Sequence, residues 1–558
     1  MSAKMGIGME SFEEIREIGA YYVDKTELIF DLLENNTRNS KVTLFTRPRR
    51  FGKTLTMTML QSFFDIRRDS REAFAGLAVA GHEEFCARWM NQYPTIFLSL
   101  KGVNGLDFDS AYDMLKAVIA EVCQAHLYLE KSDKVLPADL EIFRRLISKQ
   151  GSISDVRKSL QVLTSMLHAE YGKKAILLID EYDVPLAKAS ERDLEREVFY
   201  PQMLDVIRGL FDNAMKTNEH LELAVLTGCL RISKESIFTG MNNFACYSIL
   251  DTEFSEYFGF TEAEVREILR AIGSEESYEK VKQWYDGYIF GKSHVFCPWD
   301  VICYLATLQN DREARPKNYW RNTSGNGILL TFVARSDFDV SDKFETLLNG
   351  GTIRQRVYDE LTYDSLHDSE ENLWSLLLMT GYVTKVRPGA EGDEVELRLP
   401  NREIGNLFAD TVVKHFKESL DTTIQKELLE ALWNGEEEKA SELMTDILFT
   451  TISYHDYHEN YYHAFLTGLL TGMGYAVKSN QENGLGRTDI DIREKKKRRA
   501  MIIEAKKSAS AEDMEKDALA GVKQIAAREY LKGFEGYRSV LGYGVAFYRK
   551  MALVKKLC

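Results

Sequence analysis

Four side chains near the carboxyl end of the chain have the types and spacing needed to cut a phosphodiester. Alternation with a period of two residues places Asp489 and Asp491 on one face of an expected strand. After a highly charged hairpin tip, the returning strand carries Glu504 and Lys506 on that same face. We expect Asp489 and Glu504 to hold magnesium, and Lys506 to stabilise negative charge or help to activate water.

Two residues outside this hairpin are candidates to assist it. Glu459 opens a helical stretch and shares a helix face with His463, four residues later. Gln524 lies on a further helical stretch downstream. Other interpretations stay open: His463 can be a packed or capping histidine, Gln524 an ordinary surface glutamine, and the hairpin an exposed ion pair.

A second group of residues, near the amino end, has the chemistry of a phosphate-binding loop. A strand-like run leads into a loop that ends in Gly52-Lys53-Thr54, and a helical run follows. Such a loop presents backbone N–H groups to phosphate, while the lysine reaches the β- and γ-phosphates and the hydroxyl binds magnesium. Arg47 replaces the first glycine of the usual G-x-x-x-x-G-K-[ST] pattern, and Arg50 is a further candidate for nucleotide contact.

Acidic residues at the end of a later apolar run complete this second group. The run ends in Asp180 and Glu181. We expect Asp180 to hold magnesium together with Thr54, and Glu181 to orient or deprotonate the attacking water. The alternative is that the acidic pair caps the segment that follows. Thr227 and Arg231 are candidates for sensing or contacting the γ-phosphate, and either can be structural instead.

These residues require a parallel α/β sheet to position them. In the first half of the chain, apolar runs alternate with helical stretches, and the runs are nearly continuous, as in strands covered on both faces. One run lies between the phosphate loop and the acidic pair, an order that fits P-loop ATPases with an additional strand and a catalytic glutamate. The four runs are Val42–Phe45, Thr95–Leu100, Ala175–Ile179 and Leu223–Leu226.

The chain is expected to divide into four regions. They are a P-loop ATPase domain over 1–250, a helical lid over 251–345, a winged-helix-like connecting region over 346–435 and a nuclease-like α/β domain over 436–558. The connecting region is inferred from a helix at 372–380 followed by strands at 382–386 and 394–399. The lid contains the aromatic segment Trp284–Tyr288, for which packing is the favoured explanation.

Composition and charge narrow the class of protein. The 558 residues are 44% hydrophobic, which is enough for several cores, and no run approaches the roughly 18 apolar residues of a membrane span. The amino terminus lacks the apolar core of a signal peptide. Seven scattered cysteines without a CxxC pair favour a reducing compartment. We therefore expect a cytoplasmic protein with no membrane partner.

The charge is distributed unevenly along the chain. The net charge is −15, yet from Arg487 to the end there are 18 Lys and Arg against 10 Asp and Glu. This asymmetry predicts a polyanionic partner for that end, with DNA as the expected nucleic acid, and an ordinary solvated face is the alternative.

Several segments, spread in order over nearly the whole chain, carry a likeness to known proteins. They are Tyr22–Thr26, Arg47–Thr54, Leu178–Asp183, Leu226–Gly228, Arg231–Phe238, Trp284–Tyr288, Tyr319–Trp320, Asn322–Asn326, Gly486–Asp489 and Glu504–Lys506. Together they resemble a bacterial and archaeal family with an AAA-ATPase-like amino-terminal domain and a PD-(D/E)XK nuclease superfamily domain at the carboxyl end. In that family an arginine is expected at Arg47, so this departure from the usual loop does not count against ATP binding.

The resemblance implies a fold, cofactors and site residues. The fold is an α/β multidomain one: a P-loop ATPase sheet with an additional strand, a helical and winged-helix-like middle, and a restriction-endonuclease-like α/β domain. The cofactors are ATP and Mg²⁺. Gly52, Lys53, Thr54, Asp180 and Glu181 are implied for the ATPase site, and Asp489, Glu504 and Lys506 with Glu459 and Gln524 for the nuclease site.

Two hypotheses remain from the sequence. In the first, ATP binding or hydrolysis controls a magnesium-dependent nuclease that acts on nucleic acid. In the second, the ATPase is a switch, and the carboxyl-terminal domain holds nucleic acid or a partner without cutting it. A homo-oligomer is compatible with either hypothesis.

Overall fold

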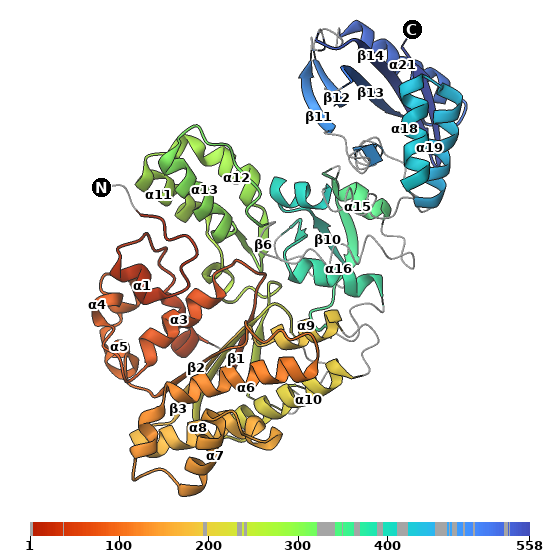
Figure 1. Cartoon of the computed structure of the whole chain (residues 1–558). Helices are drawn as coiled ribbons and strands as arrows, with labels where there is room; N and C mark the ends of the chain where they lie inside the picture. Colours follow the sequence, from red (N-terminus) through yellow and green to blue (C-terminus); the bar gives the residue numbers. More distant parts are fainter. Residues whose placement is uncertain are drawn as a thin grey trace. The chain divides into compact units, whose positions relative to one another are not determined.

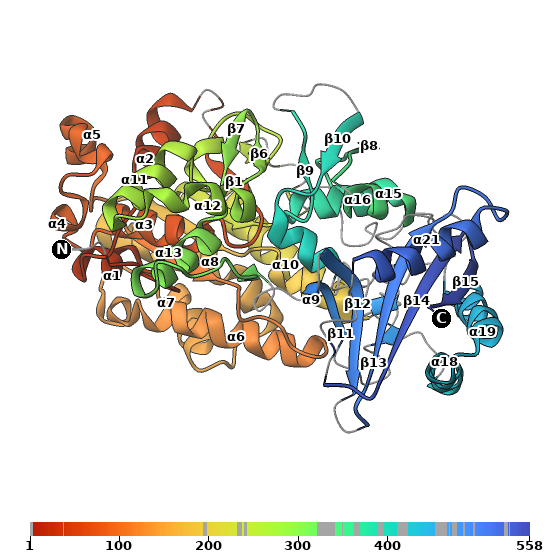
Figure 2. The same ribbon diagram turned by 90° about the horizontal axis from the view of Figure 1, so that it is seen from above.

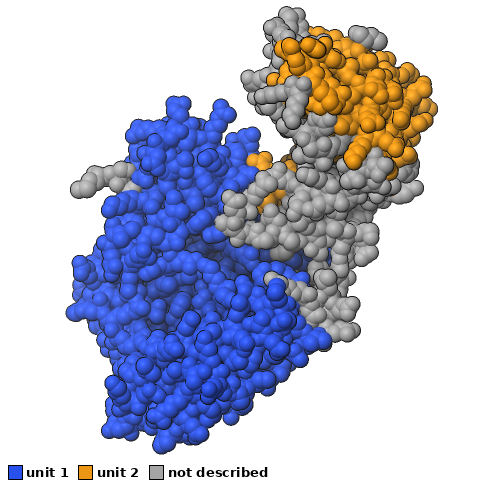
Figure 3. Space-filling model, in the orientation of Figure 1, with its two compact units in different colours: residues 1–320, 354–403 blue, residues 321–353, 404–558 orange. Residues whose placement is uncertain are grey.

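The structure is a computed structural model of the whole chain (Figure 1). It describes residues 4–36, 38, 40–192, 198–231, 237–238, 241, 243–320, 341–348, 350–361, 369–387, 394–409, 422–451, 462, 466–467, 469–470, 477–483, 486–494, 497–528, 534 and 536–557. The chain forms two compact units, and each unit is assembled from two separate stretches of sequence. The first unit takes residues 1–320 and 354–403, and the second takes residues 321–353 and 404–558 (Figure 3).

The first unit is built on a five-stranded sheet in which every pair of neighbouring strands is parallel. The strand order is β2-β3-β4-β1-β5, so β4 lies between the strand that leads into the phosphate loop and the strand that ends in the acidic pair. This order confirms the expected P-loop sheet with an additional strand. The strands are β1 (Val42–Thr46), β2 (Thr95–Ser99), β3 (Ala175–Asp180), β4 (Leu221–Gly228) and β5 (Phe244–Tyr247).

Helices cover this sheet and supply its core. Every residue of β3 is buried, because helices pack on the sheet and leave no polar face for that strand. Helix α3 packs along β2, β3 and β4, while α6 contacts β2 and α8 contacts β3. These helices and their neighbours are α3 (Lys53–Phe64), α6 (Phe108–Gln124), α7 (Pro137–Ile147), α8 (Ile153–Tyr171), α9 (Val184–Arg192) and α10 (Phe199–Phe211).

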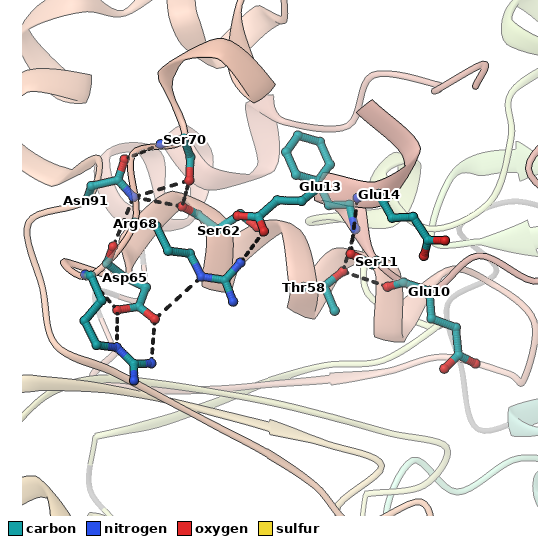
Figure 4. Close-up of polar contacts among 12 residues, drawn as sticks. Glu10, Ser11, Glu13, Glu14, Thr58, Ser62, Asp65, Arg68, Ser70 and Asn91 are labelled. Carbon is teal, nitrogen blue, oxygen red and sulfur yellow. Dashed lines mark hydrogen bonds and ion pairs between the residues drawn. The ribbon is translucent and has the colours of Figure 1, made fainter. Parts of the chain in front are cut away.

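Polar contacts hold helix α3, whose first residue is Lys53, along its length and at its far end (Figure 4). Near its middle, the Thr58 hydroxyl donates to the carbonyl of Glu10 at 2.8 Å, just before helix α1 (Phe12–Glu17). At its far end, the Asn91 amide donates to the carbonyls of Ser62 and Asp65 at 3.0 and 3.1 Å. Because the far end is fixed, the phosphate loop at the near end has a rigid support.

The remainder of the first unit begins with an aromatic helical region, as expected. Its helices share one apolar core that includes Tyr285 and Tyr304. A small sheet of order β8-β10-β9 follows with helix α16, so the expected helix and both expected strands are present. The winged-helix assignment itself stays a prediction, and residues 388–393 lie outside the described residues. The elements are α11 (Glu262–Ile272), α12 (Tyr278–Tyr285), β6 (Tyr288–Phe290), β7 (Ser293–Val295), α13 (Pro298–Asn310), β8 (Ile353–Arg356), α16 (Glu370–Met379), β9 (Thr384–Lys385) and β10 (Glu394–Arg398).

The second unit is a mixed five-stranded sheet of order β11-β12-β13-β14-β15. Only the pair of β13 and β14 is parallel among these described strands. Helix α21 covers one face, and α18 and α19 cover the other (Figure 2). The strands are β11 (Val477–Asn483), β12 (Gly486–Glu494), β13 (Arg499–Lys507), β14 (Ser539–Tyr548) and β15 (Met551–Lys556), and the helices are α18 (Thr422–Asn434), α19 (Glu437–Thr451) and α21 (Met514–Ala527).

Two of the sequence predictions are confirmed at this level. The fold class is mixed α/β, with a parallel sheet in the first unit and a mixed sheet near the carboxyl end. The expected hairpin is the β12–β13 pair, in which Asp491 lies opposite Ile502. The boundaries of the four regions stay predictions. None of the described helices combines the length and the apolar character needed to cross a lipid bilayer.

Candidate nucleotide and nuclease sites

Lys53 is the centre of the candidate nucleotide site. Its ammonium group donates to the carbonyls of Arg47 and Pro48, both at 3.2 Å, and lies 3.3 Å from a Glu181 carboxylate oxygen. Burial lowers the pKa of Lys53, but its acidic neighbours, Cys229 and Glu181 foremost, raise that pKa above its ordinary value. The lysine therefore stays protonated at the first turn of α3, where a phosphate group can replace the loop carbonyls.

Asp180 lies beside this lysine and collects two hydroxyl groups. Thr54 donates to one of its carboxylate oxygens at 2.9 Å, and Thr227 donates to the other at 2.7 Å. Asp180 is fully buried at the end of β3, and burial raises the pKa of its carboxyl group. A cation would offset that cost, so the hydroxyl and carboxylate oxygens of Thr54 and Asp180 fit Mg²⁺, which prefers hard oxygen ligands.

Glu181 has an unusual backbone conformation. Its φ is 53°, in the left-handed region that residues other than glycine rarely adopt. Holding a residue there costs on the order of 1 kcal/mol, and such strain is concentrated at functional sites. The turn directs the carboxylate toward Lys53, as the 3.3 Å contact shows. This geometry suits a group that must face the phosphates rather than continue the strand.

Asp183 is a residue of this site to which the sequence reasoning gave no role. Its buried carboxylate accepts from the backbone N–H groups of Cys229 and Leu230, at 2.9 and 3.0 Å. It therefore ties the turn after β3 to the turn after β4, which places the Thr227 end of β4 beside Asp180. Its presence two residues after Glu181 in an acidic stretch was the available signal.

Three arginines of this region, Arg47, Arg50 and Arg231, have different surroundings. Arg47 is fully buried and donates to the carbonyls of Thr46 and Tyr247, so it braces the loop from inside, and burial lowers its pKa to about 10. The guanidinium of Arg50 lies 4.1 Å from the centre of the Trp299 ring. Arg231 instead forms ion pairs with Asp359 and Glu360, at 3.3 and 3.2 Å.

These positions bear on the predicted phosphate contacts. The ion pairs of Arg231 reach the segment that follows β8, not the phosphate loop. Arg50 lies within the loop itself, between the buried Arg47 and the helix that starts at Lys53. A phosphate contact of Arg231 or Arg50 stays a prediction.

The candidate nuclease site lies on the face of the second sheet that α21 covers. A Glu504 oxygen accepts from the backbone N–H of Asp489 at 3.4 Å, and an Asp489 oxygen accepts from the backbone N–H of Ala505 at 3.0 Å. The Lys506 ammonium lies 3.8 Å from Glu504, and the Gln524 amide donates to Glu504 at 2.9 Å. Four of the predicted residues therefore meet. Glu459 and His463 lie outside the described residues.

The electrostatics of this cluster favour a bound cation. Glu504 is fully buried, and burial together with the nearby Asp489 charge raises its pKa to about 8, which Lys506 only partly opposes. Two adjacent carboxylates without a counter-ion repel each other. Within the described part of the chain, no set of three or more His, Cys, Asp or Glu side chains gathers as a metal site, here or at any other place. Two carboxylates alone suit Mg²⁺, which keeps several of its waters and takes ligands from a substrate phosphate.

Asp491 has a different environment although it shares the strand face with Asp489. It is fully buried and lies 2.9 Å from a guanidinium nitrogen of Arg493. The Arg493 guanidinium in turn lies over the Phe534 ring, 4.4 Å from its centre. This pair occupies the end of the hairpin nearer its tip, so Asp491 has a local partner.

Glycine allows α21 to bring Gln524 to the site. A Cβ atom on Gly544 of β14 would lie 2.0 Å from the carbonyl oxygen of Ala518 in α21. Gly521 of the same helix lies against both Gly544 and Glu504. The helix can therefore approach the sheet closely, and its next turn places the Gln524 amide on Glu504.

Two family models match this chain, one within each unit. A family model described as a predicted AAA-ATPase, the AAA-ATPase-like family, matches residues 6–238, and a PD-(D/E)XK nuclease superfamily model matches residues 457–556. An uncharacterized protein in the vnfD 5′ region of Azotobacter chroococcum mcd 1 is 25% identical over 502 residues, which is 88% of this chain and 87% of that protein. The likeness therefore runs through both units.

Proposed function

We propose, for a chain that joins an AAA-ATPase-like domain to a carboxyl-terminal PD-(D/E)XK nuclease superfamily domain, that ATP bound in the first unit controls magnesium-dependent cutting of DNA by the second. The observation that carries this proposal is the convergence of Asp489, Glu504, Lys506 and Gln524 on one sheet face. The six described cysteines are unpaired, which supports a reducing, cytoplasmic location.

In the nucleotide site, the residues divide the work by position. Lys53 would neutralise the β- and γ-phosphates, and the loop N–H groups at the start of α3 would bind their oxygens. Thr54 and Asp180 would hold Mg²⁺, which supplies neutralisation of the developing phosphate charge. Glu181 lies within 3.3 Å of Lys53 and can orient a water toward the γ-phosphate.

In the nuclease site, the same logic applies to a phosphodiester. Asp489 and Glu504 would hold Mg²⁺, which supplies an activated water and a partner for the leaving oxygen. Lys506 lies at the edge of the pair and can stabilise the negative charge that develops on the phosphate. Gln524 fixes the orientation of Glu504, as hydrogen bonds to ligating carboxylates generally do.

Nucleic acid is the polyanion that best suits the second unit. Basic side chains are exposed on several of its elements, and a polyanion gains affinity from such charges through release of its counter-ions. The exposed basic residues include Lys497, Arg498, Lys507, Lys523, Arg528 and Arg538. DNA is proposed over RNA on the likeness to the nuclease superfamily alone.

Cutting of supercoiled plasmid DNA tests the proposal. We expect Mg²⁺-dependent nicking by the full chain, and loss of at least about a hundredfold in rate in Glu504→Ala, as when a metal ligand is removed. Glu515→Ala, which removes an exposed acid of the same unit, is the control and keeps the rate. DNA binding without cutting in Mg²⁺ or Mn²⁺ would instead support the nucleotide-dependent binding switch.

Lys53→Ala tests the nucleotide half of the proposal. Loss of a buried, charge-assisted contact is expected to weaken ATP binding by about tenfold to a hundredfold, measured with a fluorescent ATP analogue. The nicking rates of the wild type and of Lys53→Ala are also compared at an ATP concentration that saturates the wild type. A difference between these two rates means that the two sites are linked. Unchanged ATP binding in Lys53→Ala would contradict the phosphate-loop assignment.

A further inference from the structure

A buried pair of carboxyl groups lies in the first unit, outside both sites. Asp300, in the first turn of α13, and Glu403 are each 1% exposed, and their carboxyl groups lie within hydrogen-bonding reach of each other. Two carboxylates have no donor between them, so the pair holds a proton. Burial raises the pKa of both groups, which keeps that proton in place. Neither proposed reaction uses this pair.

One end of the pair reaches the phosphate loop through a cysteine. The Cys297 thiol lies 3.9 Å from the carbonyl oxygen of Arg50 and beside the Asp300 side chain, and its single S–H can donate to one of these two acceptors at a time. The next residue of the loop, Phe51, packs on the rings of Tyr288 and Phe290, with centroids 5.0 and 4.9 Å away. The loop therefore rests on this region on both sides of the Arg50–Phe51 peptide.

The other end of the pair holds the two points at which the chain leaves the first unit. A Glu403 oxygen accepts from the backbone N–H of Trp320 at 2.7 Å. The chain passes into the second unit directly after Trp320, and it does so again directly after Glu403. One buried carboxyl group thus binds both exits together.

The Trp284–Tyr288 segment contributes to the same connection. The Asn401 amide donates to the carbonyl of Asp286 at 2.9 Å, two residues before Glu403. Tyr288 follows in β6 and contacts Phe51 of the loop. This aromatic segment, for which packing was the favoured explanation, therefore packs between the phosphate loop and the second exit of the chain.

We propose that Cys297, Asp300 and Glu403 are positioning residues that link occupancy of the phosphate loop to the two chain segments entering the second unit. This inference rests on the proposed nucleotide site. A phosphate bound by the loop shifts the Arg50 carbonyl, the thiol and the acid pair follow, and the anchorage of Trp320 and Glu403 changes with them. Coupling of this kind needs a contiguous set of contacts with two arrangements, and the four groups supply the contacts.

Hydrogen–deuterium exchange of the full chain, with and without Mg·ATP, tests the link without requiring nuclease activity. In the wild type we expect ATP to change the exchange of peptides containing Trp320 and Glu403. Cys297→Ala removes the bridging thiol, so it should abolish that change and weaken ATP binding about fivefold, the effect of one buried hydrogen bond. Cys297→Ser keeps a donor and should restore both. Cys123→Ala, at a buried cysteine in α6, is the control.

Variants of Glu403 provide the second arm. Glu403→Gln imitates the protonated acid, since its amide can donate to Asp300 while its oxygen accepts from Trp320, so the ATP response should persist. Glu403→Ala should abolish it, and if that variant does not fold, Cys297→Ala decides. A folded Cys297→Ala protein with the full ATP response overturns the inference. A wild type that binds ATP without any response at the two exits does the same, whereas a wild type that binds no ATP contradicts the proposed function itself.

Discussion

Gly228, at the end of β4, packs tightly against the turn that follows β3. A Cβ atom there would lie 2.5 Å from the Tyr182 ring and 2.8 Å from an Asp183 carboxylate oxygen. Tyr182 is itself fixed by a hydrogen bond to the carbonyl of Leu230. The end of β4 therefore has no room for a side chain at Gly228. The close packing of β4 against this turn places the Thr227 hydroxyl where it donates to Asp180.

Gly228→Ala is expected to destabilise the first unit by about 2 kcal/mol, because overpacking a rigid site forces side chains and backbone apart. ATP binding should weaken as well, since Thr227 and Asp183 both move. Thermal unfolding and titration with a fluorescent ATP analogue measure the two effects. Gly102→Ala, where a Cβ meets nothing within 4 Å, should leave both unchanged. Wild-type stability in Gly228→Ala would show that the turn can yield.

Gln524 gives a second prediction at the scale of a residue. It donates to Glu504, so replacing it with glutamate would set a third carboxylate against the pair and replace a donor by an acceptor. An orienting partner of a metal ligand typically contributes tenfold to a hundredfold in affinity. We therefore expect Gln524→Ala to weaken Mn²⁺ binding by about tenfold, as measured by calorimetry. Equal Mn²⁺ affinity in the wild type and Gln524→Ala would remove this role from Gln524.

At the scale of elements, the approach of α21 to β14 decides whether the nuclease site is assembled. Gly544→Ala would drive a methyl group into the carbonyl of Ala518 and push the helix from the sheet. We expect a loss of DNA nicking together with a lower unfolding temperature, because Gln524 leaves Glu504. Gly536→Ala, with open space around its Cβ, is the matched control. Retained nicking in Gly544→Ala would mean that the site tolerates a displaced α21.

Elements with a strong local pattern could be predicted from the sequence. The four continuous apolar runs correspond to β1, β2, β3 and β4, because burial on both faces leaves no polar position in a strand. The edge strand β5 (Phe244–Tyr247) was not predicted, since its four residues carry no pattern and its pairing with β1 fixes it. Likewise, the period-two alternation of β12 and β13 was enough to place Asp489, Glu504 and Lys506 on one face.

Contacts between distant segments could not be predicted in the same way. The Asp300–Glu403 pair joins residues of α13 to a segment beyond β10, and no local periodicity relates them. Arg231 shows the converse. Its place after an apolar run suggested phosphate, but pairing with Asp359 and Glu360 depends on a segment far along the chain. The spacing of residues along the sequence predicts which side chains share a face of one helix or strand. It does not predict which faces of different elements pack together, because that depends on the fold.

At the scale of the whole molecule, the Asp300–Glu403 pair should make stability depend on pH. Burial and the Asp300 charge raise the pKa of Glu403 from 4.5 to about 9. Between those values the unfolded chain has released the proton and the folded chain keeps it, so the contribution to folding falls as pH rises. The titratable groups near the pair are Cys297, Cys303, Tyr285, Tyr288, Tyr319 and Arg50.

Glu403→Gln, which cannot ionise, should therefore gain unfolding temperature relative to the wild type on going from about pH 5 to about pH 9. Calorimetric melts at several pH values measure the difference. Asp155→Asn is the control with the opposite sign, because its hydrogen bond with Arg145 lowers the pKa of Asp155 to about 2 and its contribution is lost only in acid. Its difference from the wild type should stay flat over that window. A flat difference for Glu403→Gln as well would contradict the raised pKa.

The interleaving of the two units also has a consequence for synthesis on the ribosome. The first unit needs residues 354–403, which emerge only after residues 321–353 of the second unit have left the exit tunnel. During synthesis, the backbone N–H of Trp320 therefore lacks its Glu403 acceptor until residue 403 has emerged, and residues 321–353 emerge before that. A fragment that ends at residue 320 lacks residues 354–403 of the first unit, and a fragment that starts at residue 404 lacks residues 321–353 of the second unit. Nascent chains arrested before residue 403 are the species in which chaperones would find unfinished surface.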